Sequence, residues 1–226
     1  DQNILYIGSQ YEYSKKENGE SLNKKSFYSN FVDLGYEITP IWYDEYHEDL
    51  QQEIINKANE IKPEVIFFIL QLGQIKKNTL KKLKNDGHYL VNWFGDDQWR
   101  FDDFSSKYAS YFDACITTDK FSVEKYKAIG QKNIIRSQWA SLPSKIEYKN
   151  IKYKYDVSFI GGVNRFREWF VKELSKRGVK VHCFGAGWKN GRVSYDEMEA
   201  IFVTSKINLN ISNNNADYYV KRILTI

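Results

Sequence analysis

Two consecutive acids, Asp96 and Asp97, stand among aromatic residues in the segment WFGDDQWRF, residues 93–101. A carboxylate can accept hydrogen bonds from sugar hydroxyls or act as a general base, and aromatic faces can lie against the C–H surface of a sugar ring. The segment follows an apolar run, which places it at the carboxyl end of a predicted strand, where α/β proteins bind ligands. We expect one acid to face a cleft and the other to cap the next helix. The alternative is structural, with one acid as a cap and Trp99 in the core.

A glycine pair, Gly161 and Gly162, ends the apolar run 155–160 and directly precedes a predicted helix. Glycine lets the backbone approach a ligand closely, and a helix N-terminus favours negative charge. Arg165 and Arg167 could add bidentate hydrogen bonds to phosphate oxygens. The segment predicts a diphosphate site, against the alternative of a tight strand-to-helix turn with two solvated arginines.

A second glycine pair, Gly185 and Gly187, follows another apolar run and precedes Trp188. The indole could border the base or ribose of a nucleotide, or it could close the end of the sheet against solvent. A third run is expected to end at Ser212. In α/β proteins, nucleotides bind where a strand ends in glycine and a helix begins directly afterwards. Nucleotide-linked chemistry is therefore the first hypothesis.

Charge and histidine spacing argue against two classes of partner. The 226 residues include 33 Lys and Arg against 29 Asp and Glu, a net charge of +4 that is too small and dispersed to indicate nucleic-acid binding. His47, His88 and His182 lack the spacing of metal ligands, so no metal site is expected.

Cysteine usage and hydropathy predict the compartment. Cys115 and Cys183 both lie in apolar runs, which is typical of core cysteines in a reducing environment. No segment reaches the roughly 20 apolar residues needed to cross a bilayer, and no signal peptide is visible after Asp1. We expect a cytoplasmic protein without a membrane span.

The elements that position these residues alternate regularly between apolar runs and helix-length segments. This alternation predicts an α/β fold with parallel sheets covered by helices on both faces. Pro40 predicts an edge position or a bulge for the second strand. In the first half, strands are predicted at 3–8, 37–44, 65–70, 88–97, 114–119 and 133–139, and helices at about 21–34, 48–61, 76–85 and 121–129.

The alternation stops in a Lys-rich segment, residues 141–155, and restarts afterwards. We interpret this segment as a connection between two Rossmann-like lobes. The first lobe is expected at residues 1–142. The second, residues 155–226, is short for a complete Rossmann domain, so the sequence predicts an incomplete second lobe.

The order of several segments resembles the CgeB-like (spore maturation protein) group of GT-B glycosyltransferases. The resemblance covers about residues 93–222 and runs through WFGDDQWRF, ACITTDKFSVEKYKAIG, YDVSFIGG, FREWFVKELSKRGVKVHCFGAGW, SYDEMEAIFVTSKINLNIS and VKR. It implies two facing Rossmann domains, with a nucleotide-sugar donor held mainly by the second and an acceptor held mainly by the first. It also implies transfer without a metal ion, in which backbone amides and basic side chains stabilise the departing diphosphate.

The same resemblance implies roles for individual residues. The donor would be a UDP- or GDP-linked sugar, with no further cofactor, and Asp96 or Asp97 would orient or deprotonate the hydroxyl of a glycan, protein or small-molecule acceptor. The expected donor-binding residues are Gly161, Gly162, Arg165 and Arg167 at the diphosphate, Gly185, Gly187 and Trp188 at the base or ribose, and Ser212, Lys221 and Arg222 at the phosphates or sugar.

One departure from the family pattern leaves alternatives open. Family members continue after the Lys-Arg pair with Phe-Glu, whose Glu usually holds the donor ribose, whereas Leu224 and Thr225 stand here. The chain is then either a piece of a longer protein or a relative with an incomplete donor site. The second hypothesis is therefore a non-catalytic nucleotide- or carbohydrate-binding module. A dinucleotide-dependent oxidoreductase ranks last, because Gly8 stands alone where G-x-G-x-x-G would be needed.

Overall fold

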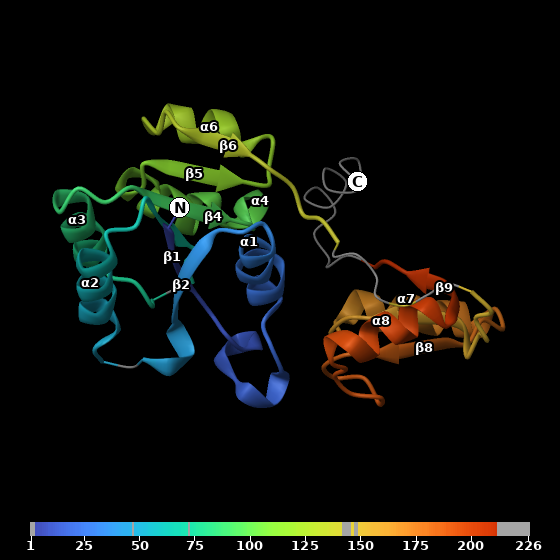
Figure 1. Cartoon of the computed structure of the whole chain (residues 1–226). Helices are drawn as coiled ribbons and strands as arrows, with labels where there is room; N and C mark the ends of the chain where they lie inside the picture. The colour runs from blue at the N-terminus through green and yellow to red at the C-terminus, as the bar shows by residue number, and fades with distance from the viewer. Residues whose placement is uncertain (1–2, 47, 72, 142–145, 147–148, 212–226) are drawn as a thin grey trace. The chain divides into compact units, whose positions relative to one another are not determined.

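The computed structural model describes residues 3–46, 48–71, 73–141, 146 and 149–211. The chain divides into two compact units, Asp1–Ser141 and Leu142–Ile226, and each has its own parallel sheet (Figure 1). The prediction of an α/β fold with two Rossmann-like parallel-sheet lobes is confirmed. In the described part of the chain, no helix is both long and apolar enough to cross a membrane.

The first unit contains a six-stranded parallel sheet in the order β2-β1-β3-β4-β5-β6. The chain leaves β1 toward β2 on one side and then crosses back to β3 on the other, so the winding direction reverses between β1 and β3. Pro40 lies in β2 at the edge of the sheet, as predicted, because proline has no N–H to give to a second neighbour. The strands are β1 (Asn3–Gly8), β2 (Glu37–Trp42), β3 (Val65–Phe68), β4 (Leu90–Phe94), β5 (Ala114–Thr117) and β6 (Ile134–Arg136).

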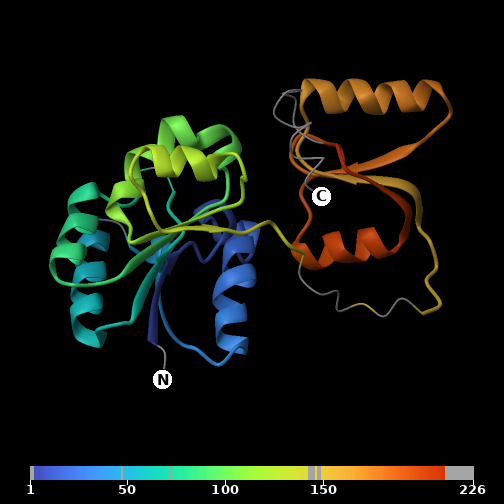
Figure 2. The same cartoon turned by 90° about the horizontal axis from the view of Figure 1, so that it is seen from above.

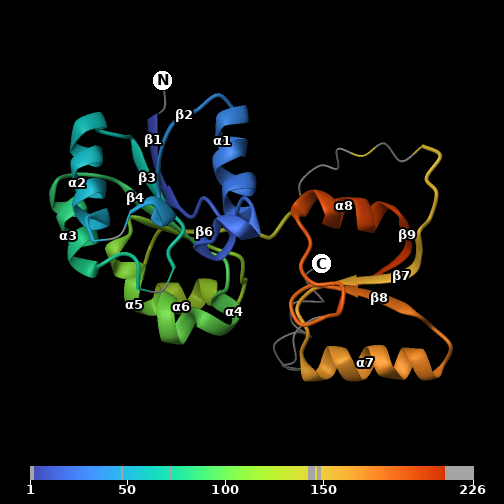
Figure 3. The ribbon, with the colours of Figure 1, turned by 90° about the horizontal axis from the view of Figure 1, so that it is seen from below.

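Helices cover both faces of this sheet, with α1 on one face and α2 and α3 on the other (Figures 2 and 3). The predicted helix 21–34 is present, but it contains a π-helical turn, Lys24–Tyr28, that the sequence did not indicate. The α- and π-helical segments are the π-helical turn Lys24–Tyr28, α1 (Ser29–Asp33), α2 (Leu50–Ile61), α3 (Lys77–Asn85), α4 (Asp97–Arg100), a second π-helical turn Phe101–Ser105, α5 (Ser106–Tyr108) and α6 (Ser122–Ala128). In the described part of this unit, four short 3-10 helices accompany them: Glu12–Ser14, Lys16–Asn18, Tyr43–Glu45 and Ala109–Tyr111.

The two faces of the sheet carry two separate cores because successive side chains of a strand point to opposite sides. Leu5, Ile7 and Phe68 pack toward α2 and α3, together with aromatic residues from the segment after β4. Tyr6 and Phe67 pack on the other face, against the helix that contains α1. Each such side chain contributes about 1.5–3 kcal/mol when fully buried. This double core holds the carboxyl ends of β1, β3 and β4 in a fixed arrangement.

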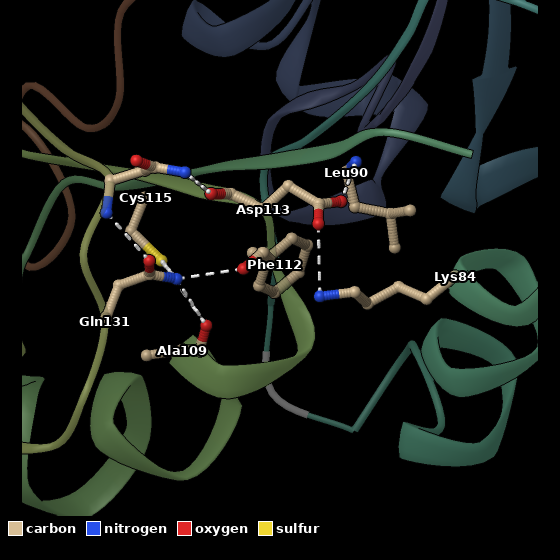
Figure 4. Close-up of polar contacts among 8 residues, drawn as sticks. Lys84, Leu90, Ala109, Phe112, Asp113, Cys115 and Gln131 are labelled. Carbon is tan, nitrogen blue, oxygen red and sulfur yellow. Dashed lines mark hydrogen bonds and ion pairs between the residues drawn. The ribbon is translucent and has the colours of Figure 1, made fainter. Parts of the chain in front are cut away.

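A buried glutamine fixes the entry into β5 (Figure 4). The Gln131 amide donates to the carbonyl oxygens of Ala109 and Phe112, each at 2.9 Å, and contacts the Cys115 sulfur at 3.5 Å. Asp113 accepts a hydrogen bond from the Leu90 N–H at 2.8 Å. The carbonyls that end a helical turn thus gain partners inside the core, which such groups require. The contacts tie the beginning of β5 to its neighbour β4.

The second unit has a three-stranded parallel sheet in the order β8-β7-β9. Helices α7 and α8 lie on opposite faces of it (Figures 2 and 3). Asn164 caps α7 by accepting the Arg167 N–H at 2.8 Å, and α8 begins with a reciprocal Ser194–Glu197 capping box. The elements are β7 (Tyr155–Ile160), α7 (Arg165–Lys176), β8 (Val181–Phe184), α8 (Tyr195–Val203) and β9 (Ser205–Leu209).

Several predicted strands are longer than the observed ones. The predicted strand 88–97 is only Leu90–Phe94, because the backbone turns at Gly95 and a helix starts at Asp97. The third run of the second unit ends at Leu209, and Ser212 lies outside the described residues.

Candidate functional site

The first unit contains a pocket of about 360 Å³ at the carboxyl ends of β1, β3 and β4. Ser9 follows β1, Gln71 follows β3, and Gly95 and Asp96 follow β4. The winding direction reverses between β1 and β3, and ligands of open α/β sheets bind at such a switch point. The topology therefore places this pocket where a binding site is expected.

Two polar groups of the pocket lie deep in the protein without a partner. Ser9 is 2% exposed and Trp93 is 7% exposed. Among the residues that the structure describes, neither the Ser9 Oγ nor the Trp93 Nε1 has a hydrogen-bond partner. The Ser9 carbonyl, in contrast, accepts from the Ser21 hydroxyl at 2.6 Å. The Ser9 carbonyl is therefore engaged, whereas the Ser9 hydroxyl and the Trp93 indole N–H have no partner among the described residues.

Tryptophan rings and one glycine shape one wall of the pocket. The Trp139 indole donates to the Gly95 carbonyl at 3.1 Å and packs edge to face on Trp93, with ring centroids 5.7 Å apart. A Cβ at Gly95 would lie 2.6 Å from the Trp139 ring and 2.9 Å from the Trp93 Nε1. Gly95 is therefore required by the close approach of the two rings. Trp139, which lies 44 residues beyond Gly95 in the chain, was not predicted as a site residue.

The charged side chains at the pocket are Glu12, Asp96 and Arg100. The Arg100 guanidinium lies over the Phe104 ring at 4.2 Å from its centroid, which fixes the cation against an aromatic face. The loop that carries Glu12 is held by Asp44, whose carboxylate accepts the backbone N–H groups of Gln10 and Tyr11. The loop after β1 is thus anchored to the end of β2.

The paired acids separate into two environments. Asp96 lines the pocket and stands at the N-cap position of α4 without a side-chain cap hydrogen bond. Asp97 is 1% exposed, and its Oδ2 accepts from the Thr117 hydroxyl at 2.6 Å and the Tyr126 hydroxyl at 2.8 Å. Burial raises the pKa of the Asp97 carboxyl above its usual value, and these hydroxyls oppose the shift.

Two sequence expectations about this segment are wrong. Neither acid caps α4 through its side chain, because Asp97 turns into the core toward β5 and α6 and Asp96 faces the pocket. The alternative that places Trp99 in the core also fails, since Trp99 is 59% exposed. One acid faces a cavity, as expected, and the structure identifies it as Asp96.

The glycine segments of the second unit bind each other. The Gly161 N–H donates to the Phe184 carbonyl at 2.8 Å, and the Trp188 indole donates to the Gly161 carbonyl at 2.9 Å. Gly185 has φ +125°, and a Cβ there would overlap the carbonyl of Gly161. A Cβ at Gly187 would overlap the Val163 side chain. The four glycines predicted for donor binding thus belong to two turns packed on one another, and Trp188 seals that contact.

The two arginines predicted at the diphosphate differ in their contacts. The Arg167 guanidinium donates to the carbonyl of Ile211 through Nε at 3.0 Å and Nη2 at 2.8 Å, and to the Gly162 carbonyl through Nη1 at 2.7 Å. It also lies over the Phe159 ring. Arg165 is exposed at the first position of α7. Ser212, Lys221 and Arg222 lie outside the described residues.

No group of three or more His, Cys, Asp or Glu side chains that could hold a metal ion is found among the described residues. Transfer without a metal remains a prediction. Ser9 and Gln71 were also missed from the sequence, although both are polar residues directly after apolar runs, which is the available signal.

Residues 165–224 match a family model described as glycosyl transferase-like. No curated protein matches the chain. Among solved structures, a protein described as an ABC transporter, LacI family transcriptional regulator from Brachyspira murdochii aligns with a TM-score of 0.36 and 12% identity, over 82% of this chain and 58% of that one. Alr3699/HepE of Anabaena, solved with UDP and glucose, aligns with a TM-score of 0.44 and 8% identity, over 93% of this chain and 70% of that one.

Both TM-scores lie below 0.5, so no activity of either protein is carried over to this chain. The family-model match concerns sequence and covers α7, β8, α8 and β9 of the second unit. The chain therefore contains a glycosyl transferase-like segment.

Proposed function

We propose that this protein is a glycosyltransferase that moves a sugar from a UDP- or GDP-linked donor to an acceptor hydroxyl. The observation that carries the proposal is the match of residues 165–224 to the glycosyl transferase-like model. The pocket of the first unit supports it, because a carboxylate stands there beside aromatic rings at the switch point of a parallel sheet.

On the donor side, the start of α7 is proposed to receive the diphosphate. Helix α7 begins three residues after Gly162, and a helix N-terminus stabilises negative charge, although Asn164 already accepts the Arg167 N–H there. Arg165 is exposed at this position and is the preferred cationic contact. Arg167 is assigned to positioning, because its guanidinium already holds two backbone carbonyls. The roles of Ser212, Lys221 and Arg222 at the phosphates or sugar stay part of the proposal.

On the acceptor side, Asp96 is proposed as the general base. Its carboxylate would take the proton of the acceptor hydroxyl while that oxygen forms a bond to the donor sugar and the nucleoside diphosphate leaves. Asp97 does not reach the pocket and is assigned a positioning role, since its hydrogen bonds to Thr117 and Tyr126 hold the turn on which Asp96 stands.

The test is the Asp96→Asn variant, assayed for release of UDP or GDP from a panel of nucleotide sugars and for transfer to added saccharides. We expect turnover to fall by about 10²–10⁴-fold, because the base is removed, with donor affinity and melting temperature nearly unchanged. Asp103→Asn, which changes an exposed carboxylate on the same segment, is the matched control. Full activity in Asp96→Asn would show that the base lies elsewhere.

A second candidate function is a non-catalytic nucleotide- or carbohydrate-binding module. It is favoured by one observation: the glycine turns and Arg167 of the second unit are already engaged with each other and with the backbone. This module would bind a saccharide or nucleotide without releasing nucleoside diphosphate from any donor. The same assay, run beside a binding measurement, separates the two functions.

A further inference from the structure

The net charge of +4 is divided unevenly between the two units. In the first unit, residues 1–141, 18 Lys and Arg stand against 21 Asp and Glu, which gives −3. In the second unit, residues 142–226, 15 Lys and Arg stand against 8 Asp and Glu, which gives +7. The small net charge of the whole chain thus conceals a strongly basic unit. Such a unit attracts anionic partners.

The two helices of the second unit differ in charge. Helices α7 and α8 lie on opposite faces of its sheet (Figure 3). Helix α8 contains Asp196, Glu197 and Glu199 and no Lys or Arg. In α7 the cations outnumber the acids: it contains Arg165, Arg167, Lys172 and Lys176 against Glu168 and Glu173. Of the two helices, α7 is therefore the basic one.

The exposed cations of α7 share one side of the helix. Arg165, Lys172 and Lys176 are seven and four residues apart, so they fall within about 40° of one another around the helix axis. The Lys172 and Lys176 side chains are 68% and 70% exposed. Each forms an ion pair with a glutamate of the same helix, and exposed pairs of this kind are weak. Both ammonium groups can therefore turn toward another anion.

A tryptophan lies among these cations. Trp169 follows Arg165 by four residues, which places it on the same side of the helix. Its side chain is 54% exposed, and its ring contacts those of Phe166 and Phe170, with centroids 5.7 and 6.5 Å away. These two phenylalanines pack against the core of the unit. We call this side of the helix, which carries Arg165, Trp169, Lys172 and Lys176, the outer side of α7.

An exposed indole among cations fits the surface of an anionic bilayer. Tryptophan favours the boundary between water and lipid because its ring is apolar and its N–H is polar. Helices that lie on membranes combine such a ring with Lys and Arg, which anionic headgroups attract. From Arg165 to Lys176 the outer side is about 16 Å long. A layer of lipid headgroups supplies negative charge along this whole length and does not require a groove on the protein.

We propose that the outer side of α7 docks on an anionic lipid bilayer, with Trp169 at the boundary of the headgroups and acyl chains. Lys172 and Lys176 face the headgroups on either side of the indole. The protein then binds the membrane surface without crossing it. This docking needs no donor, acceptor or transfer step, so it stands independently of the proposed function.

The experiment measures co-sedimentation of the full chain with lipid vesicles. One set of vesicles contains phosphatidylcholine alone, and the other contains phosphatidylcholine with phosphatidylglycerol. We expect binding to the anionic vesicles at low salt and none to the neutral ones. High salt should release the protein, because it screens the attraction between exposed charges.

Variants of the outer side should weaken this binding. Lys172→Gln/Lys176→Gln should lower the affinity for anionic vesicles by about 10-fold, because two cations are removed from the headgroup layer. The matched control is Lys125→Gln/Lys127→Gln, which removes two exposed, ion-paired lysines at α6 of the first unit and should have no effect. Circular dichroism checks that each variant is folded.

The position of the indole is tested separately. Trp169→Ser should lower the affinity by about 5-fold because an apolar ring is lost from the boundary, whereas Trp99→Ser, at a tryptophan that is 59% exposed in the first unit, should not. Vesicles with brominated acyl chains should quench the fluorescence of the wild type. Trp169→Phe keeps a ring at this position, so it should still bind but lose the quenching.

Four results would overturn the inference. The first is absence of binding to anionic vesicles at low salt, and the second is an equal loss of affinity in the control pair. The third is binding without quenching by brominated lipid, together with binding of heparin that needs Lys172 and Lys176, which would assign the outer side to a soluble polyanion. The fourth is self-association in gel filtration without lipid that Lys172→Gln/Lys176→Gln abolishes, which would assign it to the acidic α8 of a second copy.

Discussion

The strand ends of the two units use the same sequence pattern, an apolar run followed by glycine, for opposite purposes. In the first unit, Gly95 makes room for two indole rings beside a pocket in which buried polar groups lack partners. In the second unit, Gly161 and Gly185 let two backbone segments touch. The Gly161 N–H donates to the Phe184 carbonyl, the Val163 N–H donates to the Ala186 carbonyl, and the Gly161 carbonyl accepts from the Trp188 indole. One set of strand ends is open to a ligand, and the other is closed on itself.

This difference shows what a glycine after a strand can and cannot indicate. It reports that something approaches the backbone closely, and that neighbour can be a ligand, a side chain or another turn of the chain. The partners of the surrounding polar atoms distinguish these cases. By this criterion the first unit has the stronger claim to a small-molecule site.

The closed arrangement is tested most strongly by Gly185→Ala. The added Cβ overlaps the Gly161 carbonyl, and alanine is strained at φ +125°. We expect the second unit to lose about 3 kcal/mol of unfolding free energy, from overpacking together with backbone strain. Urea unfolding followed by circular dichroism measures the change.

The matched control is Gly191→Ala. Gly191 also has a positive φ, +70°, but a Cβ there meets no atom within 4 Å. Its loss should be about 1 kcal/mol, from strain alone. Equal losses in the two variants would mean that the turns separate readily and that the second unit is not closed.

A smaller effect is expected from Arg167→Ala. This change leaves the carbonyls of Ile211 and Gly162 without their donor and should reduce the stability of the second unit by about 2 kcal/mol. The control is Arg165→Ala, which should cost less than about 0.5 kcal/mol because Arg165 is exposed. Calorimetry with UDP or GDP in the presence of EDTA sharpens the comparison. Weaker binding in Arg165→Ala at unchanged stability would place the anion at the start of α7, whereas unaffected binding in both variants removes these arginines from the donor site.

The smallest effect concerns the pH dependence of stability in the first unit. Burial raises the pKa of Asp97 above its ordinary 3.8, so the folded state binds its proton more tightly than the unfolded state. The contribution of this group is fully present below pH 3.8 and is lost as the pH rises through the folded-state pKa. As the pH rises, the unfolding free energy of the wild type should therefore fall relative to that of Asp97→Asn.

Urea denaturation at a series of pH values from 3 upward tests this, with Asp103→Asn as the control for an exposed carboxylate. Other acids change stability in the opposite sense: the hydrogen bond from Lys82 lowers the pKa of Asp86, so its contribution is lost as the pH falls. The informative quantity is the difference from wild type. Parallel curves for wild type and Asp97→Asn would contradict the raised pKa.

Much of the fold can be predicted from local sequence. Runs such as VIFF in β3 and LVNWF in β4 are continuous and apolar, which buried parallel strands require, and Pro40 correctly indicates the edge strand. Strand ends are less visible: the apolar run of β3 continues through Ile69 and Leu70, although the strand itself ends at Phe68. The π-helical turn Lys24–Tyr28 was not predicted from the sequence.

The site is less predictable than the fold because it depends on strand order. Ser9, Gln71 and Asp96 meet only because β1, β3 and β4 are neighbours with their carboxyl ends together, and the sequence does not state that order. The separation of Asp96 from Asp97 could be expected from their adjacency at a turn. Which of them would enter the core depends on Thr117 and Tyr126, more than 19 residues further along the chain.

Each unit holds one cysteine in its core, Cys115 in β5 and Cys183 in β8. Burial raises the pKa of the Cys115 thiol to about 12 and that of Cys183 to about 11, so neither forms the reactive thiolate readily at neutral pH. Cys115 is fully buried and Cys183 is 8% exposed, so a thiol reagent reaches Cys115 only after the first unit opens, and it reaches Cys183 faster when the second unit opens. The alkylation rate of each cysteine therefore reports local opening of its own unit. Cys115 reports on the unit with the pocket, and Cys183 reports on the unit with the paired glycine turns.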